Sequence, residues 1–304
     1  MFDIVSVGHF SIDSIMLPNR SAPFVVLGGS PAYVSFTSRR LDNTVSVISK
    51  VGSDFPAAYH WWLEQEGVNL SGLTKVEDAA TTHFELEYNS DLSSRILRLK
   101  NRGPPITIED LPKTLKARAI HIAPIDGEIT CEVVEKLKSC AEVVSLDPQG
   151  LVRNFAENGN ITYGPLPDPH ILDLINIYKS SQNEIQAITG QTELDQAMKQ
   201  IHDHGAKIVI VTQGASGSTL SVEGSIYKVP AYPPDKVSDP TGAGDAFVGG
   251  FLAEYVYGEN LFRCACVGAA AASLVVEGIG PTFFGDKETI YQRARQLYEK
   301  EIKE

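Results

Sequence analysis

Residues 239–247 of the chain read Asp-Pro-Thr-Gly-Ala-Gly-Asp-Ala-Phe, and they carry the strongest pattern in the sequence. Pro240 favours a turn, and Thr241 can cap a helix that begins directly after it. Gly242 and Gly244 have no Cβ, so an anion can come close to the backbone amides beside them. At a helix N-terminus such amides are free donors, and the helix dipole also favours negative charge. The stretch therefore predicts an anion-binding helix start.

Asp245 follows in the first turn of the predicted helix. A hole made by the amides of Gly242, Ala243 and Gly244 matches the spread negative charge of a phosphoryl group in transfer. A carboxylate beside that hole is placed to accept the proton of an attacking hydroxyl. The alternative interpretation is a well-capped helix with an acid near its positive end. A cap, two glycines and a following acid within nine residues favour the catalytic interpretation. The stretch is not a Walker A loop, because no Gly-Lys-Ser/Thr follows.

Strand-like and helical patterns alternate along the rest of the chain. Alternation of this kind predicts an α/β fold with a mostly parallel central sheet, flanked by helices on both faces. Ligands bind such sheets beyond the carboxyl ends of the strands. The expected strands are 3–8, 45–49, 119–123, 143–146, 174–178 and 207–212, with a hairpin near 218–229. The expected helices are 28–41, 55–66, 129–139, 184–189, 194–204, 243–257, 260–276 and 287–302.

Two segments, about 10–27 and 73–100, do not fit that sheet. They are β-prone, and residues 84–87 alternate between apolar and acidic side chains. We expect them to form a small β-sheet lid over one edge of the main sheet, within a single domain of residues 1–304. A lid suits phosphoryl transfer because the exclusion of water suppresses hydrolysis of the donor.

The composition restricts the partners of the chain. The net charge is -12, from 38 acidic and 26 basic side chains, and such a surface repels nucleic acid and anionic lipid. No apolar stretch approaches the roughly 20 residues of a membrane span, and Asp3 interrupts the first apolar run. We therefore expect a cytoplasmic protein without nucleic-acid or membrane partners. An open β face on the lid would allow a homodimer.

The stretch 239–247 resembles the C-terminal signature of the PfkB, or ribokinase-like, family of sugar and nucleoside kinases, and the likeness extends over nearly the whole chain. The resemblance implies a Rossmann-like α/β domain with a small β lid. It also implies transfer of the γ-phosphoryl group of ATP, with Mg²⁺, to a hydroxyl of a small polyol or sugar. Asp245 would be the base, and residues 242–244 would form the anion hole.

The same resemblance implies further site residues. Asp13 matches the acid that holds substrate hydroxyls, and Gly28-Gly29 matches the double glycine where the substrate meets the backbone. Ser30 stands where many members carry an asparagine. On the nucleotide side, the implied residues are Thr212, Gly214 and Gly217 along the phosphates, and residues 269–280 beside the adenine.

Lys179-x-Ser181-x-x-Glu184 aligns with the Asn-x-x-Glu motif that organises Mg²⁺ and phosphates through water in many members, with Ser181 in place of the asparagine. Together with Asp147-x-Gln149 and Arg153, this segment resembles the myo-inositol kinase branch. Gln149, Arg153 and Asp13 offer donors and acceptors suited to the hydroxyls of a cyclitol. The alternative interpretation of Asp147 and Arg153 is a structural salt bridge.

Three other functions compete with this interpretation. A sugar or nucleoside kinase of the same family is the first, and Tyr33 or Phe84 could supply a slot for a base. A regulatory protein that binds nucleotide without turnover is the second, and the retention of Asp245 and Glu184 argues against it. A dinucleotide oxidoreductase is the third, and it is excluded because no Gly-x-Gly-x-x-Gly follows the first strand.

Overall fold

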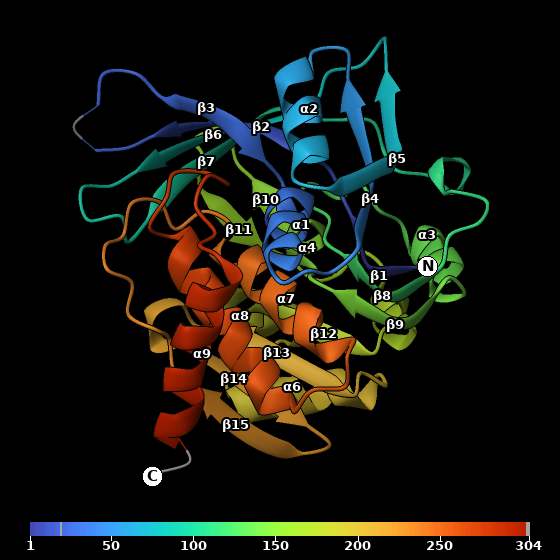
Figure 1. Cartoon of the computed structure of the whole chain (residues 1–304). Helices are drawn as coiled ribbons and strands as arrows, with labels where there is room; N and C mark the ends of the chain where they lie inside the picture. Colours follow the sequence, from blue (N-terminus) through green and yellow to red (C-terminus); the bar gives the residue numbers. More distant parts are fainter. Residues whose placement is uncertain (19, 302–304) are drawn as a thin grey trace.

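The computed structural model describes residues 1–18 and 20–301. In this part of the chain the centre is a nine-stranded sheet in the order β15-β14-β13-β12-β9-β8-β1-β4-β5 (Figure 1). Neighbours from β13 to β5 are parallel, and β14 and β15 add an antiparallel hairpin at one edge. The strands are β1 Phe2–Val7, β4 Val45–Gly52, β5 Val68–Val76, β8 Ala117–Ile122, β9 Ala141–Leu146, β12 Ile177–Ser181, β13 Ile208–Thr212, β14 Ser218–Val222 and β15 Ser225–Val229.

Helices cover both faces of this sheet, as the alternating pattern predicts. In β13, Ile208 and Ile210 face one hydrophobic core while Val209 and Val211 face the other, because successive side chains of a strand point to opposite faces. The first core contains α1 Ser30–Arg40, α7 Ala243–Tyr255, α8 Leu261–Val275 and α9 Lys287–Glu301; the second contains α3 Cys131–Lys138, α5 Gln182–Thr189 and α6 Leu194–Asp203. The remaining helices are α2 Ala57–Gln65 and α4 Gln149–Val152, with short 3₁₀ turns at Ile108–Asp110, Pro169–Leu174 and Gly214–Ser216.

A second, four-stranded sheet forms the lid, in the order β3-β2-β6-β7. Its strands are β2 Ser11–Met16, β3 Phe24–Gly28, β6 Thr82–Tyr88 and β7 Arg95–Asn101. The lid sheet is mixed, because β2 and β6 are parallel while the other pairs are antiparallel. Its apolar side chains pack against Ile125 of the main domain, and the hairpin β10 Arg153–Phe155 and β11 Ile161–Tyr163 lies against it.

The predicted fold class is confirmed, but two segments differ from expectation. Residues 73–76 belong to β5, which pairs with β4 at the edge of the main sheet, so the lid does not begin at residue 73. A half-exposed edge strand alternates in the same way as a lid strand, which explains the error. The strand expected at 174–178 begins at Ile177, and Pro169–Leu174 forms a 3₁₀ turn. A continuous apolar run does not mark where a turn becomes a strand.

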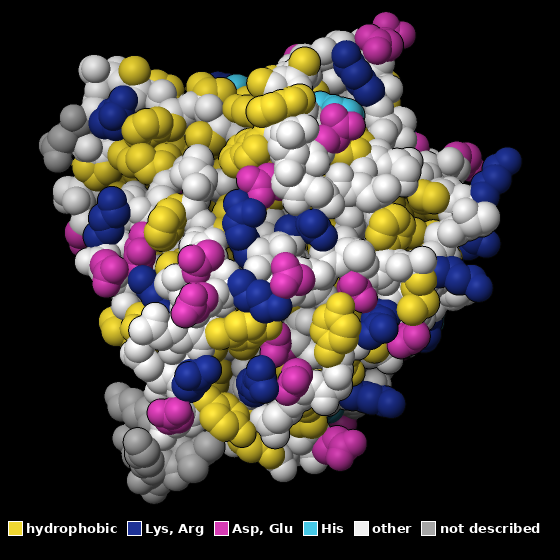
Figure 2. Space-filling model, in the orientation of Figure 1, with side chains coloured by type: hydrophobic (Ala, Val, Ile, Leu, Met, Phe, Trp, Pro, Cys, Tyr) yellow, Lys and Arg dark blue, Asp and Glu magenta, His cyan; other side chains and the backbone are white. Residues whose placement is uncertain are grey.

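The two parts also differ at the surface. Figure 2 shows hydrophobic side chains gathered at the top of the view, over the lid and α2, while acidic and basic side chains alternate over the helices below. Val25 of β3 and Trp61 of α2 are among the exposed apolar residues. In the part of the chain that the structure describes, no helix is long and apolar enough to cross a membrane. A homodimer formed through the lid stays a prediction.

Candidate active site

The predicted anion-binding turn forms at the start of α7, but Thr241 does not cap the helix. Gly242 is the N-cap, in a left-handed conformation with φ 79°, and no side chain caps α7. Asp239 holds the turn instead, because its carboxylate accepts the Thr241 amide at 2.9 Å and the Gly280 amide at 2.9 Å. The capping role expected for Thr241 is therefore wrong, and its hydroxyl is available for another contact.

The packing of the turn also favours glycine at position 242, in addition to the approach of an anion. A Cβ there would lie 2.2 Å from the ring of Tyr33, so the side chain of α1 packs directly on the turn. One of the three expected hole amides is partly engaged, since Ala243 donates to the Pro240 carbonyl at 3.4 Å. The aromatic ring thus supports the turn from one side.

Asp245 lies in the first turn of α7, where it heads a chain of hydrogen bonds. Gln149, which begins α4 directly after β9, donates from Nε2 to Asp245 Oδ1 at 3.2 Å. Arg153 donates to Gln149 Oε1 at 2.7 Å. Both residues were predicted to hold the acceptor, and the structure brings them to the predicted base.

The chain continues from Arg153 to Glu184. Arg153 donates through two nitrogens to Glu184 Oε1, at 3.0 and 2.7 Å, and the Ser181 amide donates to Oε2 at 2.8 Å. Burial opposes ionisation of Glu184, but Arg153 and Lys179 outweigh it and lower its pKa. Ser181 and Glu184 also form a reciprocal capping box at the start of α5. Both carboxylate oxygens are therefore engaged, and the metal role of Glu184 stays a prediction.

A buried ion pair lies behind the turn. Lys179 Nζ is 2.6 Å from Asp147 Oδ2, and both side chains are buried. Although burial lowers the pKa of Lys179, the carboxylates of Asp147, Asp245 and Glu184 raise it above its usual value. A Cβ on Gly244 would lie 2.7 Å from Nζ, so the ammonium group touches the backbone of the turn. Asp147 therefore pairs with Lys179, not with Arg153.

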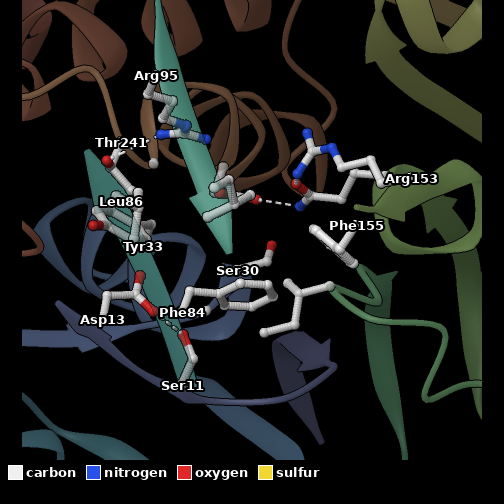
Figure 3. Close-up of a pocket in the computed structure, with 16 residues that line it drawn as sticks. Ser11, Asp13, Ser30, Tyr33, Phe84, Leu86, Arg95, Arg153, Phe155 and Thr241 are labelled. Carbon is white, nitrogen blue, oxygen red and sulfur yellow. Dashed lines mark hydrogen bonds between the residues drawn. The ribbon is translucent and has the colours of Figure 1, made fainter. Parts of the chain in front are cut away.

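A cavity of about 70 Å³ opens beside Asp245, between the lid and the main domain (Figure 3). Asp13 and Ser11 lie at one end, Arg153 and Phe155 at the other, and Arg95 lies next to Thr241. The lid is in contact with the turn, because hydrogen bonds join its tip to the Thr241 hydroxyl. The predicted residues that line the cavity are Asp13, Gly29, Ser30, Gln149, Arg153, Gly242 and Asp245.

Two residues that line this cavity carry polar groups without partners. Among the described residues, the hydroxyls of Ser30 and Tyr33 are buried and make no hydrogen bond. Burial raises the pKa of Asp13 to about 7, although Ser11 and Arg95 lower it. Gly28 packs on this acid, since a Cβ there would lie 2.1 Å from Asp13 Oδ2. The cavity therefore holds several groups that need a polar ligand.

The predicted nucleotide residues lie apart from this cavity, at the carboxyl end of β13. The Thr212 hydroxyl donates to the Ser180 carbonyl at 3.3 Å. Gly214 and Gly217 have φ 59° and 89°, and the space at Gly214 is open. None of these residues lines the cavity, and their role at the phosphates stays a prediction.

The lid contributes residues that the sequence did not indicate. Tyr88 and Arg95 face each other at the tip of the β6–β7 hairpin, and both bind the Thr241 hydroxyl. Phe84, which the sequence offered as a slot for a base, packs on Phe155 of β10 with ring centroids 5.4 Å apart. The apolar lining residues are Phe84, Leu86, Leu97, Ile125 and Phe155.

Beside the turn, the described residues form no complete set of metal ligands. Within residues 1–18 and 20–301, one group of side chains could close on an ion: Cys131, Glu135 and His170. Two of its three side chains are exposed, and none lines the cavity. A divalent ion of the kinase reaction would instead be held chiefly by phosphates, with Glu184 as the nearby acid.

Comparisons with known proteins agree with this arrangement. The model of the pfkB family carbohydrate kinases matches residues 1–288. A cytidine kinase from Thermococcus kodakarensis is 29% identical over 92% of this chain and 98% of its own length. An inositol 3-kinase from Arabidopsis thaliana is 28% identical over 92% of this chain and 76% of its own length.

A solved structure shares the fold, with a TM-score of 0.80 and 24% identity over 95% of this chain and 98% of the other. It is described as a pyrophosphate-dependent myo-inositol-1 kinase converted into a myo-inositol-3 kinase when leucines replace an asparagine and a serine eleven positions apart. Together, the family match and the relatives show that this chain belongs to the PfkB family, as an ATP-dependent phosphotransferase that acts on a hydroxyl.

Proposed function

We propose that this kinase phosphorylates a hydroxyl of a small neutral polyol, with myo-inositol as the first candidate and MgATP as the donor. The observation that carries the proposal is the pair of buried, unpartnered hydroxyls of Ser30 and Tyr33 beside Asp13 and Asp245. Each is costly to bury without a hydrogen bond. A cyclic polyol presents a hydroxyl in every direction and can satisfy several of them together.

The charges of the site favour a neutral acceptor. Arg153 is neutralised by Glu184, and Lys179 is neutralised by Asp147. Asp13 and Asp245 then face the cavity against one lid cation, Arg95. An anionic acceptor would meet two carboxylates there, whereas hydroxyls can donate to them.

Two lid leucines support a cyclitol. Leu86 and Leu97 pair across β6 and β7, and both line the cavity. They are eleven positions apart, which is also the separation of the two leucines in the converted myo-inositol-3 kinase. If the two pairs correspond, this chain carries the leucine form without any substitution.

The residues support an in-line transfer. The acceptor hydroxyl attacks the γ-phosphorus, Asp245 takes its proton, and ADP leaves with the electron pair of the broken bond. Gln149 orients Asp245 through the hydrogen bond to Oδ1. The free amides of the turn and the Lys179 ammonium group lie where they can balance charge on the phosphoryl oxygens. Magnesium, when bound, would shield the charge of the donor phosphates.

A nucleoside is the second candidate, because one wall of the cavity is aromatic. Phe84 and Phe155 lie together on that wall, and Phe84 is the cross-strand neighbour of Asp13. A flat base can pack on such rings while the ribose hydroxyls reach the polar end. The likeness to a cytidine kinase supports this option.

The deciding experiment is an ADP-release assay with ATP and Mg²⁺ against myo-inositol, ribose, fructose, adenosine and cytidine. We expect turnover with myo-inositol and none with the nucleosides. Turnover only with cytidine or adenosine would replace the cyclitol by a nucleoside and leave the chemistry of Asp245 in place. No turnover with any acceptor would contradict the proposal. Pyrophosphate and ADP in place of ATP test the donor.

The product of the reaction sharpens the proposal. We expect the Leu86→Asn/Leu97→Ser variant to phosphorylate a different hydroxyl of myo-inositol than the unmodified chain does, as judged by ³¹P and ¹H NMR of the product. The matched control is Leu99→Ser, in the same strand and outside the cavity lining. An unchanged product would remove the leucine pair from the argument.

A further inference from the structure

The tip of the lid touches the phosphate-binding turn through a triangle of hydrogen bonds. Tyr88 ends β6 and Arg95 begins β7, opposite each other. Arg95 donates to the Tyr88 hydroxyl at 2.8 Å and to the Thr241 hydroxyl at 3.1 Å, and the two hydroxyls are 2.8 Å apart. Thr241 is the residue before Gly242, so the contact joins the lid to the first residues of the anion hole (Figure 3).

This contact is not needed to build the turn. Asp239 already holds the Thr241 amide, and Gly242 caps α7 without help from a side chain. Among the described residues, the Thr241 hydroxyl has its partners on the lid only. Its side chain is therefore committed to a segment 146 to 153 residues away in the sequence, and not to the local structure.

In the part of the chain that the structure describes, the charge of Arg95 is not neutralised by a carboxylate, unlike that of the other cations of the site. Arg153 and Lys179 each have a carboxylate partner. Within the described residues, Arg95 has none, and one of its terminal nitrogens makes both of its hydrogen bonds. Its charge nevertheless reaches the cavity, because it lowers the pKa of Asp13 against the effect of burial. A guanidinium group in this position brings positive charge only while the lid is closed.

We propose that Arg95 is a positioning residue for phosphoryl transfer, which fastens the closed lid to the phosphate-binding turn through Thr241. With the lid fastened, water is excluded and the acceptor hydroxyl is held at the phosphoryl group. With it loose, water competes with the acceptor. The acceptor would enter the cavity between the lid and the main domain, so the contact opens for entry and reforms afterwards. The proposal rests on the proposed function only in requiring an acceptor.

The test uses three variants of the full chain: Arg95→Met, Thr241→Val and the double variant. Methionine keeps the length of the side chain, and valine keeps the shape of threonine. Arg95→Lys is the conservative variant, and Arg98→Met is the matched control, because Arg98 lies on the same strand but pairs with Glu87 outside the cavity lining. The readouts are transfer to the acceptor, ATP hydrolysis in the presence of the acceptor, and hydrogen–deuterium exchange of residues 82–101.

We expect Arg95→Met to lower kcat/KM for transfer about tenfold to a hundredfold, as the loss of charge-assisted hydrogen bonds implies. The ratio of hydrolysis to transfer should rise, the affinity for ATP should hold, and lid exchange should become faster. Thr241→Val should cost less, and its effect should vanish when Arg95 is already Met. Arg95→Lys should recover part of the transfer.

Three outcomes would overturn the proposal. The first is a ratio of hydrolysis to transfer that is the same in Arg95→Met and Arg98→Met. The second is faster lid exchange without a change in that ratio, which is the mark of a purely structural contact. The third is strict additivity of the two substitutions. If no acceptor is turned over, the proposed function fails by itself. Additive effects of the two substitutions on lid exchange would then still refute the proposed contact of Arg95 with Thr241.

Discussion

The turn before α7 and the tip of the lid meet at Thr241, yet they are built in opposite ways. The turn is held by neighbours: a buried carboxylate at Asp239 accepts backbone amides, and Tyr33 packs on Gly242. The lid reaches the same place with two side chains, Tyr88 and Arg95, beside the cavity. We therefore expect the first region to be fixed before a substrate arrives and the second to open and close around it.

The difference separates chemistry from selection. The groups that we propose for the phosphoryl transfer lie on the turn and at the carboxyl ends of main-sheet strands, where small displacements would be costly. The groups that we expect to select the acceptor lie largely on the lid, and they include Phe84, Leu86 and Leu97. A family can therefore keep one reaction while its members act on different acceptors.

The largest effect is expected at Asp245. Asp245→Asn keeps Oδ1 as an acceptor for Gln149, so the geometry should survive while the base is lost. We expect kcat to fall by a factor of about 10² to 10⁴, with the affinity for ATP unchanged. Steady-state kinetics and nucleotide titration measure both, with Asp78→Asn, an exposed acid outside the cavity lining, as the control. Near-normal turnover in a folded Asp245→Asn protein would show that Asp245 is not the base and that the turn does not carry the catalytic group.

The rigidity of the turn can be measured with two glycines. Gly242 and Gly214 both have positive φ, but a Cβ meets the Tyr33 ring at Gly242 and open space at Gly214. Gly214→Ala should lower the free energy of unfolding by about 1 kcal/mol, from backbone strain alone. Gly242→Ala should cost about 2–4 kcal/mol, because the clash adds to the strain. Urea unfolding gives both values, and equal losses would mean that Tyr33 yields easily.

The ionisation of Asp13, on the lid side of the cavity, should make the free energy of unfolding depend on pH. The pKa of Asp13 is raised to about 7 by burial, so the folded state binds a proton that the unfolded state releases near pH 4. The unmodified protein therefore loses stability as the pH rises towards 7, and Asp13→Asn does not incur this loss. Between pH 5 and pH 8 the stability of the variant relative to the unmodified protein should increase by about 2–3 kcal/mol. A constant difference across that range would show that Asp13 stays ionised or solvated.

The sequence was most informative where the interactions are local. Nine consecutive residues were enough to place the turn and Asp245, and alternating patterns predicted the layers of the main sheet. Thr241 was misjudged because a capping residue and a residue one step before the cap look alike in sequence. Arg95 and Tyr88 were missed because their partner lies about 150 residues away, and no local pattern encodes such a contact.

The Ser181-x-x-Glu184 segment shows a related ambiguity. Its spacing fits both a motif that organises metal and phosphate and a helix capping box, and the structure contains the capping box. The capping box does not exclude the other role, because the same residues can also bind a ligand. The long-range pair of Arg153 with Glu184 could not have been read from the spacing either.

The carboxylate of Asp239 has an evolutionary consequence. It holds the turn at Thr241 and the loop at Gly280 with its two oxygens, so these loops cannot drift apart independently. An insertion or deletion in either loop would be transmitted to the other and to the anion hole. We therefore expect lineages of this kinase to keep the lengths of both loops while the 89–94 loop of the lid varies, and new acceptor preferences to arise there first.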